Sequence, residues 1–283
     1  MEQQSTVRLP RFADGRWYSA DPIDLRTDIR AYLGNASQTT LPGPVVGLVA
    51  PHAGHFFSGH VAAAAFAALP PDAFNTVILL GPDHRGITAG RIAALRYQAW
   101  RTPLGDTPIN WDMLGRLQNQ FPLKLLSTDN EHSLEIELPF LQLALTNFQL
   151  VPLLMGDQSA ETCRQLAKAI VSALTASDCA LLVASSDLSH FFDDSTARAL
   201  DKATLQFALD MDPAGLLEHV AAGHRRREPL ACGAGPIATV IHAAQMLGAT
   251  AAHLIKYATS ADAYAHADRN RVVGYAAVAF CRK

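Results

Sequence analysis

The chain has 283 residues, of which 49% are hydrophobic and 17% charged, enough apolar material for a sizeable core and too little charge for a disordered chain. The formal net charge of -3 argues against a general nucleic-acid-binding protein and against a binder of anionic membranes. The sequence contains no run of the roughly 18 apolar residues that a membrane helix needs, no secretory signal and no CxxC pair, so we expect a cytoplasmic protein with reduced thiols.

The first 44 residues are expected to form an irregular arm and then a short amphipathic helix. Leu25, Ile29 and Leu33 fall on one face of that helix. The arm carries two large aromatic residues, Trp17 and Tyr18. Packing of the arm on the core accounts for these aromatics, and the alternative is that they line a pocket.

Two buried strands are predicted at Val45–Ala50 and Thr76–Leu80, because both runs are apolar, rich in β-branched residues and bounded by Pro or Gly. Each run is followed by a turn that carries a histidine, His52 or His84. The carboxyl ends of such strands form the edge of an α/β sheet where ligands bind. One turn histidine usually makes only local hydrogen bonds, but two in matched settings indicate a metal or catalytic site.

The next segments alternate between helical and extended patterns. Ser58 is expected to cap an alanine-rich helix that ends at Ala67. Residues 91–106 are expected to be extended and to end in a Pro-Leu-Gly-Asp turn. A helix is predicted at Asp112–Phe121 from its apolar positions.

A further helix is expected to open within Glu131–Pro139, with Ser133 as its N-cap. His132 would then lie beside the positive end of the helix. Two interpretations of His132 stay open, a capping or packing histidine and a residue of the site.

Buried strands are also predicted at Phe148–Met155 and Cys179–Ser185, with a helix between them. The second of these strands ends in a turn that carries Asp187 and His190. This is the third apolar strand that is followed by a histidine, and the repetition favours a folded domain with a functional site over a purely structural explanation.

Two helices are predicted within residues 195–221, and a third over Ile237–Leu247. Cys232 lies between a turn and this third helix, a setting typical of a thiolate nucleophile or a metal ligand. The last two predicted strands are His253–Thr259 and Val272–Phe280. No repeat, low-complexity tract or linker interrupts the pattern, so we expect residues 1–283 to form a single α/β domain, with the arm and helix of residues 1–44 packed on its core.

Seven motifs in order carry a resemblance to a known family. They are Asp14–Tyr18 (DGRWY), Pro51–Gly59 (PHAGHFFSG), Gly81–His84 (GPDH), Thr102–Asp106 (TPLGD), Glu131–Phe140 (EHSLEIELPF), Ser185–His190 (SSDLSH) and Cys232-Gly233. This set resembles the Memo (mediator of cell motility) family over nearly the whole chain. That family is similar in fold to the catalytic subunit of class III extradiol dioxygenases such as protocatechuate 4,5-dioxygenase.

The resemblance implies an α/β/α sandwich with a mixed, largely buried central sheet and a site at one rim. It implies that His52, His84 and Cys232 are metal ligands. It further implies that His190 and Asp187 border the same pocket, and that bacterial and archaeal members are linked with a radical-SAM protein in a modification system. By the same resemblance, Trp17 matches an aromatic residue implicated in peptide binding.

The chain departs from these patterns at two positions. The dioxygenases use two histidines and a carboxylate for iron, whereas Cys232 would supply a softer thiolate here. His55 stands where the family pattern has tyrosine, and it would either change the hydrogen bonding near His52 or face solvent.

Three functions are compatible with this set of residues. The first is a redox enzyme with iron or copper, zinc being the less favoured metal, in which His190 is the acid or base and Asp187 orients it. The second is a non-catalytic protein that binds a small molecule or peptide in the same cleft through Trp17, His132 and His55. The third, ranked last, is hydrolysis with Cys232 as nucleophile and His190 as base.

Overall fold

The computed structural model describes residues 6–36 and 39–283. Within them, a nine-stranded sheet runs in the order β10-β12-β2-β9-β3-β8-β4-β7, with β11 paired to β12. Its strands are β2 (Val45–Ala50), β3 (Thr76–Pro82), β4 (Ile92–Leu95), β7 (Lys124–Leu126), β8 (Gln149–Met155), β9 (Ala180–Ser185), β10 (His190–Phe192), β11 (Ala251–Thr259) and β12 (Val272–Cys281). The predicted α/β class with a mixed sheet is confirmed, since β2, β9, β3 and β8 are parallel while β12 is antiparallel to its neighbours.

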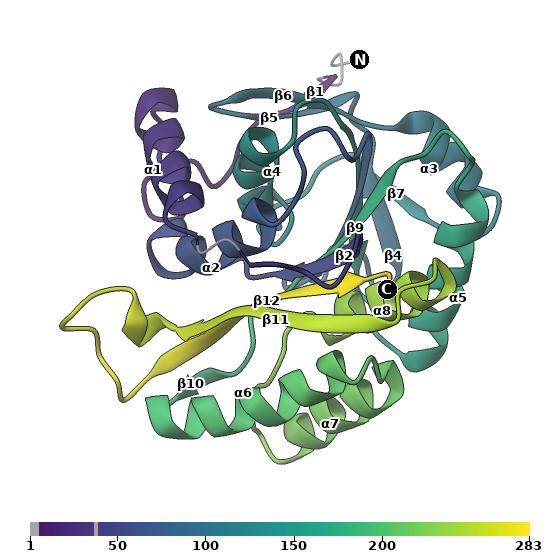
Figure 1. The fold of residues 1–283 in the computed structure, drawn as a ribbon. Helices are drawn as coiled ribbons and strands as arrows, with labels where there is room; N and C mark the ends of the chain where they lie inside the picture. The colour runs from purple at the N-terminus through teal and green to yellow at the C-terminus, as the bar shows by residue number, and fades with distance from the viewer. Residues whose placement is uncertain (1–5, 37–38) are drawn as a thin grey trace.

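Helices cover both faces of this sheet (Figure 1). The helices α1 (Pro22–Gly34), α2 (His55–Ala67) and α4 (Leu138–Ala144) lie on one face. The other face carries α3 (Trp111–Gln118), α5 (Ala160–Ala173), α6 (Asp194–Leu209), α7 (Pro213–Arg225) and α8 (Ala234–Met246). The resulting order of layers is helix, sheet, helix, which explains why the central strands are apolar along their whole length.

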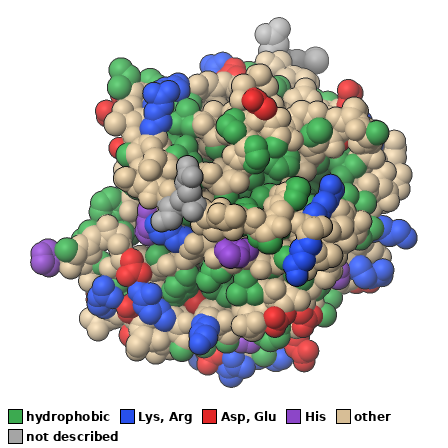
Figure 2. Space-filling model, viewed as in Figure 1, with side chains coloured by type: hydrophobic (Ala, Val, Ile, Leu, Met, Phe, Trp, Pro, Cys, Tyr) green, Lys and Arg blue, Asp and Glu red, His purple; other side chains and the backbone are tan. Residues whose placement is uncertain are grey.

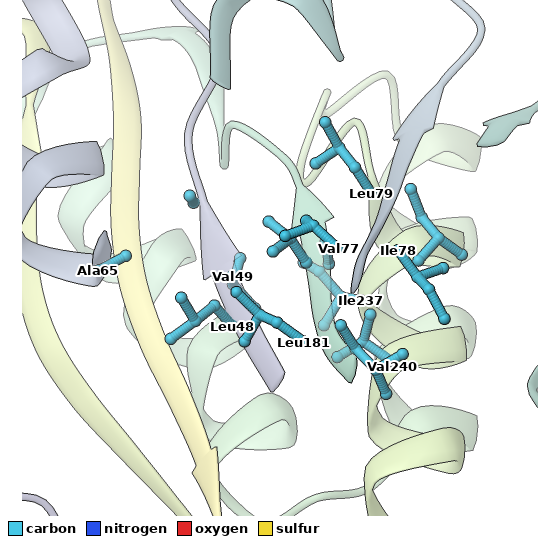
Figure 3. Packing of buried hydrophobic residues seen from close by; sticks show 14 of the residues in the cluster. Leu48, Val49, Ala65, Val77, Ile78, Leu79, Leu181, Ile237 and Val240 are labelled. Carbon is cyan, nitrogen blue, oxygen red and sulfur yellow. The ribbon is translucent and has the colours of Figure 1, made fainter. Parts of the chain in front are cut away.

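The main hydrophobic cluster lies on both faces of the sheet, and one part of it is formed where α8 packs on the parallel strands. Figure 3 shows side chains of β2, β3 and β9 beside Ile237 and Val240 of α8. A Cβ atom on Gly47 would lie only 2.7 Å from Cγ1 of Val240, so glycine is needed in β2 for this helix to approach. The close approach places the amino end of α8 near the ends of the same strands.

The N-terminal arm contacts the rest of the chain through a small sheet and buried polar side chains. Its strand β1 (Val7–Arg8) joins β5 (Ala99–Thr102) and β6 (Gly105–Pro108) in a separate three-stranded sheet. The side chain of Arg8 is buried with two carboxylates, Asp129 and Glu135. Tyr18 is also buried and donates a hydrogen bond of 2.6 Å to Oε1 of Glu135.

Two predicted helix starts are wrong. The helix α2 begins at His55 rather than at Ser58, whose hydroxyl donates to the carbonyl of Ala53 instead of capping. Ser133 is not an N-cap either, because its hydroxyl donates to the carbonyl of Pro82. A turn and the 3-10 helix η1 (Glu135–Glu137) precede α4.

The other predicted elements are found within a few residues of their expected bounds, and β1, β7 and β10 are short strands without a sequence signal. Cationic and anionic side chains are interspersed on the lower part of the face in Figure 2, where α6 and α7 lie. Among the described residues, no helix is both long and apolar enough to cross a membrane.

Candidate metal centre

Three neighbouring strands end at the edge of the sheet that carries the site. β9 lies between β2 and β3, and the three are parallel, so their carboxyl ends meet. His52 follows β2 by two residues, His84 follows β3 by two residues, and Ser185 is the last residue of β9. Histidines that are 32 positions apart in the chain (84 − 52) are thereby brought together, with ring centroids 5.2 Å apart.

Cys232 lies at the same edge of the sheet, in the turn that precedes α8. Its backbone N–H donates to the carbonyl of Asp187 (3.3 Å), and the N–H of Gly233 donates to the hydroxyl of Ser186 (2.9 Å). A Cβ atom on Gly233 would lie 2.5 Å from the carbonyl oxygen of Ser185, so this turn can approach β9 only with glycine there. These contacts hold the thiol against the ends of the strands.

His52, His84 and Cys232 each offer a ligand atom, and the three atoms lie within 4.8 Å of one another. Sγ of Cys232 is 3.4 Å from Nε2 of His52, and the thiol also raises the pKa of His84. Two imidazoles and a thiolate suit iron, copper or zinc, and three protein ligands leave a coordination position open, as catalytic sites require.

Each of these imidazoles has a second partner at its other nitrogen. Nδ1 of His52 lies 2.8 Å from the hydroxyl of Ser185, and Nδ1 of His84 lies 3.0 Å from Oε1 of Glu131. Partners of this kind orient metal-binding histidines and select their tautomer. The residues present therefore fit a metal ion, both in their ligand atoms and in the partners that orient the two histidines.

A second group surrounds Glu131 and contains His84 and His132. The carboxylate accepts hydrogen bonds from the backbone N–H groups of His84, His132 and Ser133. The ring of His132 stacks on that of His84, with centroids 4.7 Å apart, while its Nδ1 lies 3.1 Å from Glu131 without a hydrogen bond. Burial alone would raise the pKa of Glu131, but the two imidazoles outweigh burial and hold this pKa well below its usual range.

The two predicted ligand histidines differ in protonation. Burial lowers the pKa of His52 well below its usual 6.5, and charge on His132 or His84 lowers it further. Burial acts in the same direction on His84, but hydrogen bonds with Cys232 and Glu131 outweigh it and raise the pKa to about 10. In the metal-free protein the proton thus resides on His84, and binding of a cation has to release it.

The edge of the sheet opens into a cavity of about 590 Å³. His52, His84, His132, His190 and Asp187 all line it, together with Trp17 of the arm. The ring of Trp17 lies against that of His132, tilted by 42°, with ring centroids 4.4 Å apart.

Asp187 does not serve the role expected of it toward His190. Its Oδ1 accepts a hydrogen bond of 2.9 Å from the backbone N–H of His52, so the carboxylate holds the turn that carries this histidine. Burial raises the pKa of Asp187 to about 7. His190 instead interacts with the carbonyl groups of Leu188 and Leu230, and burial lowers its pKa in spite of them.

His55 is a core residue, and both expectations for it are wrong. It is 5% exposed, its Nε2 lies 3.0 Å from the carbonyl of Ile136, and its ring stacks on Tyr18. It is absent from the lining of the cavity among the described residues. His55 neither contacts His52 by hydrogen bond nor faces solvent, because the early start of α2 turns it toward the arm.

Sequence reasoning missed several residues of the site. Glu131 and Ser185 belong to the motifs that carry the resemblance, so their positions offered a signal. Arg85 directly follows His84, and proximity alone could have indicated it. Arg271 and Tyr275, which also line the cavity, come from β12 and the loop before it, where no pattern marks them.

The comparisons with known proteins cover nearly the whole chain. Residues 8–279 match the family model described as Memo-like protein. A MEMO1 family protein of Methanopyrus kandleri is 37% identical over 292 aligned residues, covering 97% of this chain and 99% of the relative. Relatives of the same description from Methanothermobacter thermautotrophicus and Archaeoglobus fulgidus are each 34% identical, covering 95% and 97% of this chain and 99% of each relative. Both kinds of match agree with the resemblance carried by the motifs, and the chain therefore belongs to the Memo family.

Proposed function

We propose that this chain is a metal-dependent redox enzyme related to class III extradiol dioxygenases, with residues 1–283 acting as one domain. His52, His84 and Cys232 would hold the metal. The observation that carries the proposal is the convergence of two imidazoles and a thiol, with each imidazole supported at Nδ1 and both imidazoles in the lining of an open cavity. A structural zinc site would instead close its coordination sphere with four protein ligands.

Iron or copper is the proposed metal, with zinc as the runner-up. The similarity to the dioxygenases favours iron, while the soft thiolate of Cys232 favours copper. Either ion would supply one-electron chemistry at the cavity when bound.

The remaining polar groups of the cavity suit proton transfer and orientation. We assign His190 as the acid or base, since burial keeps its imidazole neutral and able to accept a proton near pH 7. Burial raises the pKa of Tyr275, so its phenol stays protonated and can donate a hydrogen bond to a ligand. Asp187 would keep His52 in place through the backbone.

The lining of the cavity favours an anionic ligand with an apolar part, either a small molecule or a peptide side chain. Arg85 and Arg271 both line it, and within the described residues neither guanidinium is paired with a carboxylate. Trp17 and Phe57 supply aromatic surface beside them.

Benzoate and phenyl phosphate should bind the wild type better than neutral benzamide. The double variant Arg85→Gln/Arg271→Gln should lose that preference. Arg30→Gln, on the exposed surface of α1, is the matched control.

The test of the metal site is anaerobic titration with Fe(II) and Cu(I). The wild type should take up metal, and Cys232→Ser should bind copper much more weakly while its unfolding temperature stays nearly unchanged. Cys179→Ser removes an exposed thiol and serves as the control. Equal uptake by wild type and Cys232→Ser would remove Cys232 from the site.

His190→Ala separates the proposed acid or base from a metal ligand. This variant should keep its metal and lose activity, whereas His52→Ala should lose the metal. Absence of metal uptake by the wild type would favour the second candidate, a binding protein that uses the same cavity, where Trp17 contacts the ring of His132.

A further inference from the structure

The hydroxyl of Ser185 lies among three polar groups in the interior. Its Oγ is 2.6 Å from the carbonyl oxygen of Ser133, 2.8 Å from Oε1 of Glu137 and 2.8 Å from Nδ1 of His52. Ser185, Ser133 and Glu137 are each fully buried. These contacts link a glutamate that the proposed mechanism leaves unused to one of the proposed metal ligands.

The positions of the protons in this group follow from the chemistry of its members. A hydroxyl has one proton to donate, and a backbone carbonyl can only accept. The Ser185 proton therefore goes to the Ser133 carbonyl, because two unprotonated oxygens would otherwise face each other at 2.6 Å. The other two contacts must then be donated to Ser185, one by Nδ1–H of His52 and one by a protonated carboxyl group of Glu137.

The surroundings of Glu137 agree with a neutral acid. Its second oxygen, Oε2, has no hydrogen-bond partner within the described chain. An ionised carboxylate would be left there with a single hydrogen bond, and the titratable group that acts on it is another carboxyl group, that of Asp187. Burial raises the pKa of Glu137 well above its usual value, and Asp187 raises it further.

We propose that Glu137 is a positioning residue of the metal site, which as a neutral carboxylic acid donates to Ser185 and thereby fixes His52 in its Nδ1–H tautomer. That tautomer leaves the lone pair of Nε2 free on the side of Cys232, where a metal would bind. The role rests on the proposed function of His52 as a ligand, while the placement of the protons does not.

The two ligand histidines would then be supported differently. His84 faces an ionised carboxylate, Glu131, whereas His52 faces a neutral chain of hydroxyl and carboxylic acid. With the thiolate of Cys232, a neutral Glu137 limits the number of negative charges buried around one cation.

The first experiment uses the metal-free protein. Infrared difference spectra of wild type minus Glu137→Gln at neutral pH should contain the carbonyl band of a protonated carboxylic acid. Nitrogen NMR of the histidine ring should report the Nδ1–H tautomer for His52. Absence of the band, or an Nε2–H tautomer, would overturn the proposal whether or not the protein binds metal, so failure of the proposed function is distinguishable from failure of this inference.

The second experiment measures metal affinity in a set of variants. Glu137→Gln keeps a donor toward Ser185 and should bind metal like the wild type. Glu137→Met keeps the length without the donor, and Ser185→Ala removes the shared partner, and each should lower affinity about 10–100-fold. Because Glu137 acts through Ser185, the double variant Glu137→Met/Ser185→Ala should bind metal no more weakly than Ser185→Ala alone. Additive losses, or wild-type affinity in Glu137→Met, would contradict the proposal. Should Glu137→Met fail to fold, the infrared and NMR measurements, which use only wild type and Glu137→Gln, still decide it.

Discussion

Two buried polar clusters lie close together in this protein and differ in how well their members satisfy one another. The anchor cluster consists of Arg8, Asp129, Glu135 and Tyr18. Arg8 donates from Nε and Nη2 to the two oxygens of Asp129, at 2.7 and 2.6 Å, and from Nη1 to Glu135 at 2.5 Å. The guanidinium also lies over the ring of Trp100, 4.2 Å from its centroid. Every charge has a partner, so the cluster has nothing left to bind.

The metal-site cluster consists of His52, His84, His132, Glu131 and Cys232. Three imidazoles lie with centroids 4.7 to 5.4 Å apart, an arrangement that cannot hold three positive charges. The ligand atoms of His52, His84 and Cys232 lie within 4.8 Å of one another, and both histidines line the cavity. The contrast shows that buried charges alone do not mark a functional site. Titratable side chains that lie close together without pairing all their charges and hydrogen-bonding atoms do mark one.

Glu131 and Glu135, which are four residues apart, belong to different clusters. Both are buried, and both belong to the same motif. Glu135 accepts from Arg8, Tyr18 and the arm backbone, while Glu131 accepts from the segment that carries His84 and His132. One residue type therefore stabilises the fold at one position and supports the site four residues earlier.

The largest expected effect is on stability, from Arg8→Met. Removing the guanidinium leaves the carboxylates of Asp129 and Glu135 without their buried cation, which should cost about 3–5 kcal/mol in the free energy of unfolding. Urea denaturation measures this, and metal affinity of the folded variant should stay near that of the wild type. A loss of under about 1 kcal/mol, the range of exposed ion pairs, would show that the anchor cluster is not structurally important.

The next effect is the pH dependence of stability that His55 contributes. Burial lowers its pKa from 6.5 to about 4 in the folded protein. Between pH 6.5 and 4, His55 binds a proton in the unfolded chain but not in the folded protein. The free energy of unfolding therefore falls as the pH falls from 6.5 towards 4, by up to about 3 kcal/mol from this residue.

His55→Phe should remove that contribution and flatten the dependence of the unfolding free energy on pH over this window. His52 keeps some acid sensitivity, since its pKa is also lowered. The exposed His266→Phe is the control, and it should follow the wild-type curve. Identical curves for His55→Phe and wild type would mean that His55 is protonated without cost.

The smallest effect sharpens the comparison of the two glutamates. Glu131→Gln removes the charge that supports His84 and should weaken metal binding about 10–100-fold. Glu135→Gln should leave metal affinity unchanged and lower the unfolding free energy instead. Isothermal titration with metal and urea denaturation of both variants check this, and equal losses of metal affinity would show that the clusters are not separate.

Hydrophobic runs made much of the fold predictable. The strands at Val45–Ala50 and Val272–Cys281 lie within a residue or two of their expected bounds, since continuous apolar runs of this length need burial on both faces. Family membership was predictable too, because seven ordered motifs carry far more information than any single residue.

Only the tertiary structure decided which partner each polar side chain takes. Asp187 is three residues from His190, yet it bonds the backbone of His52, which lies 135 positions away. Serine is a residue type favoured at helix N-caps, but the hydroxyl of Ser133 donates a hydrogen bond to the carbonyl of Pro82. His55 is predicted from the sequence to be a site residue, but its ring packs on Tyr18. Apolar burial depends on local patterns that the sequence displays directly. Hydrogen bonds of the site join strand ends and turns that are neighbours only after the sheet has formed, and no local pattern specifies them.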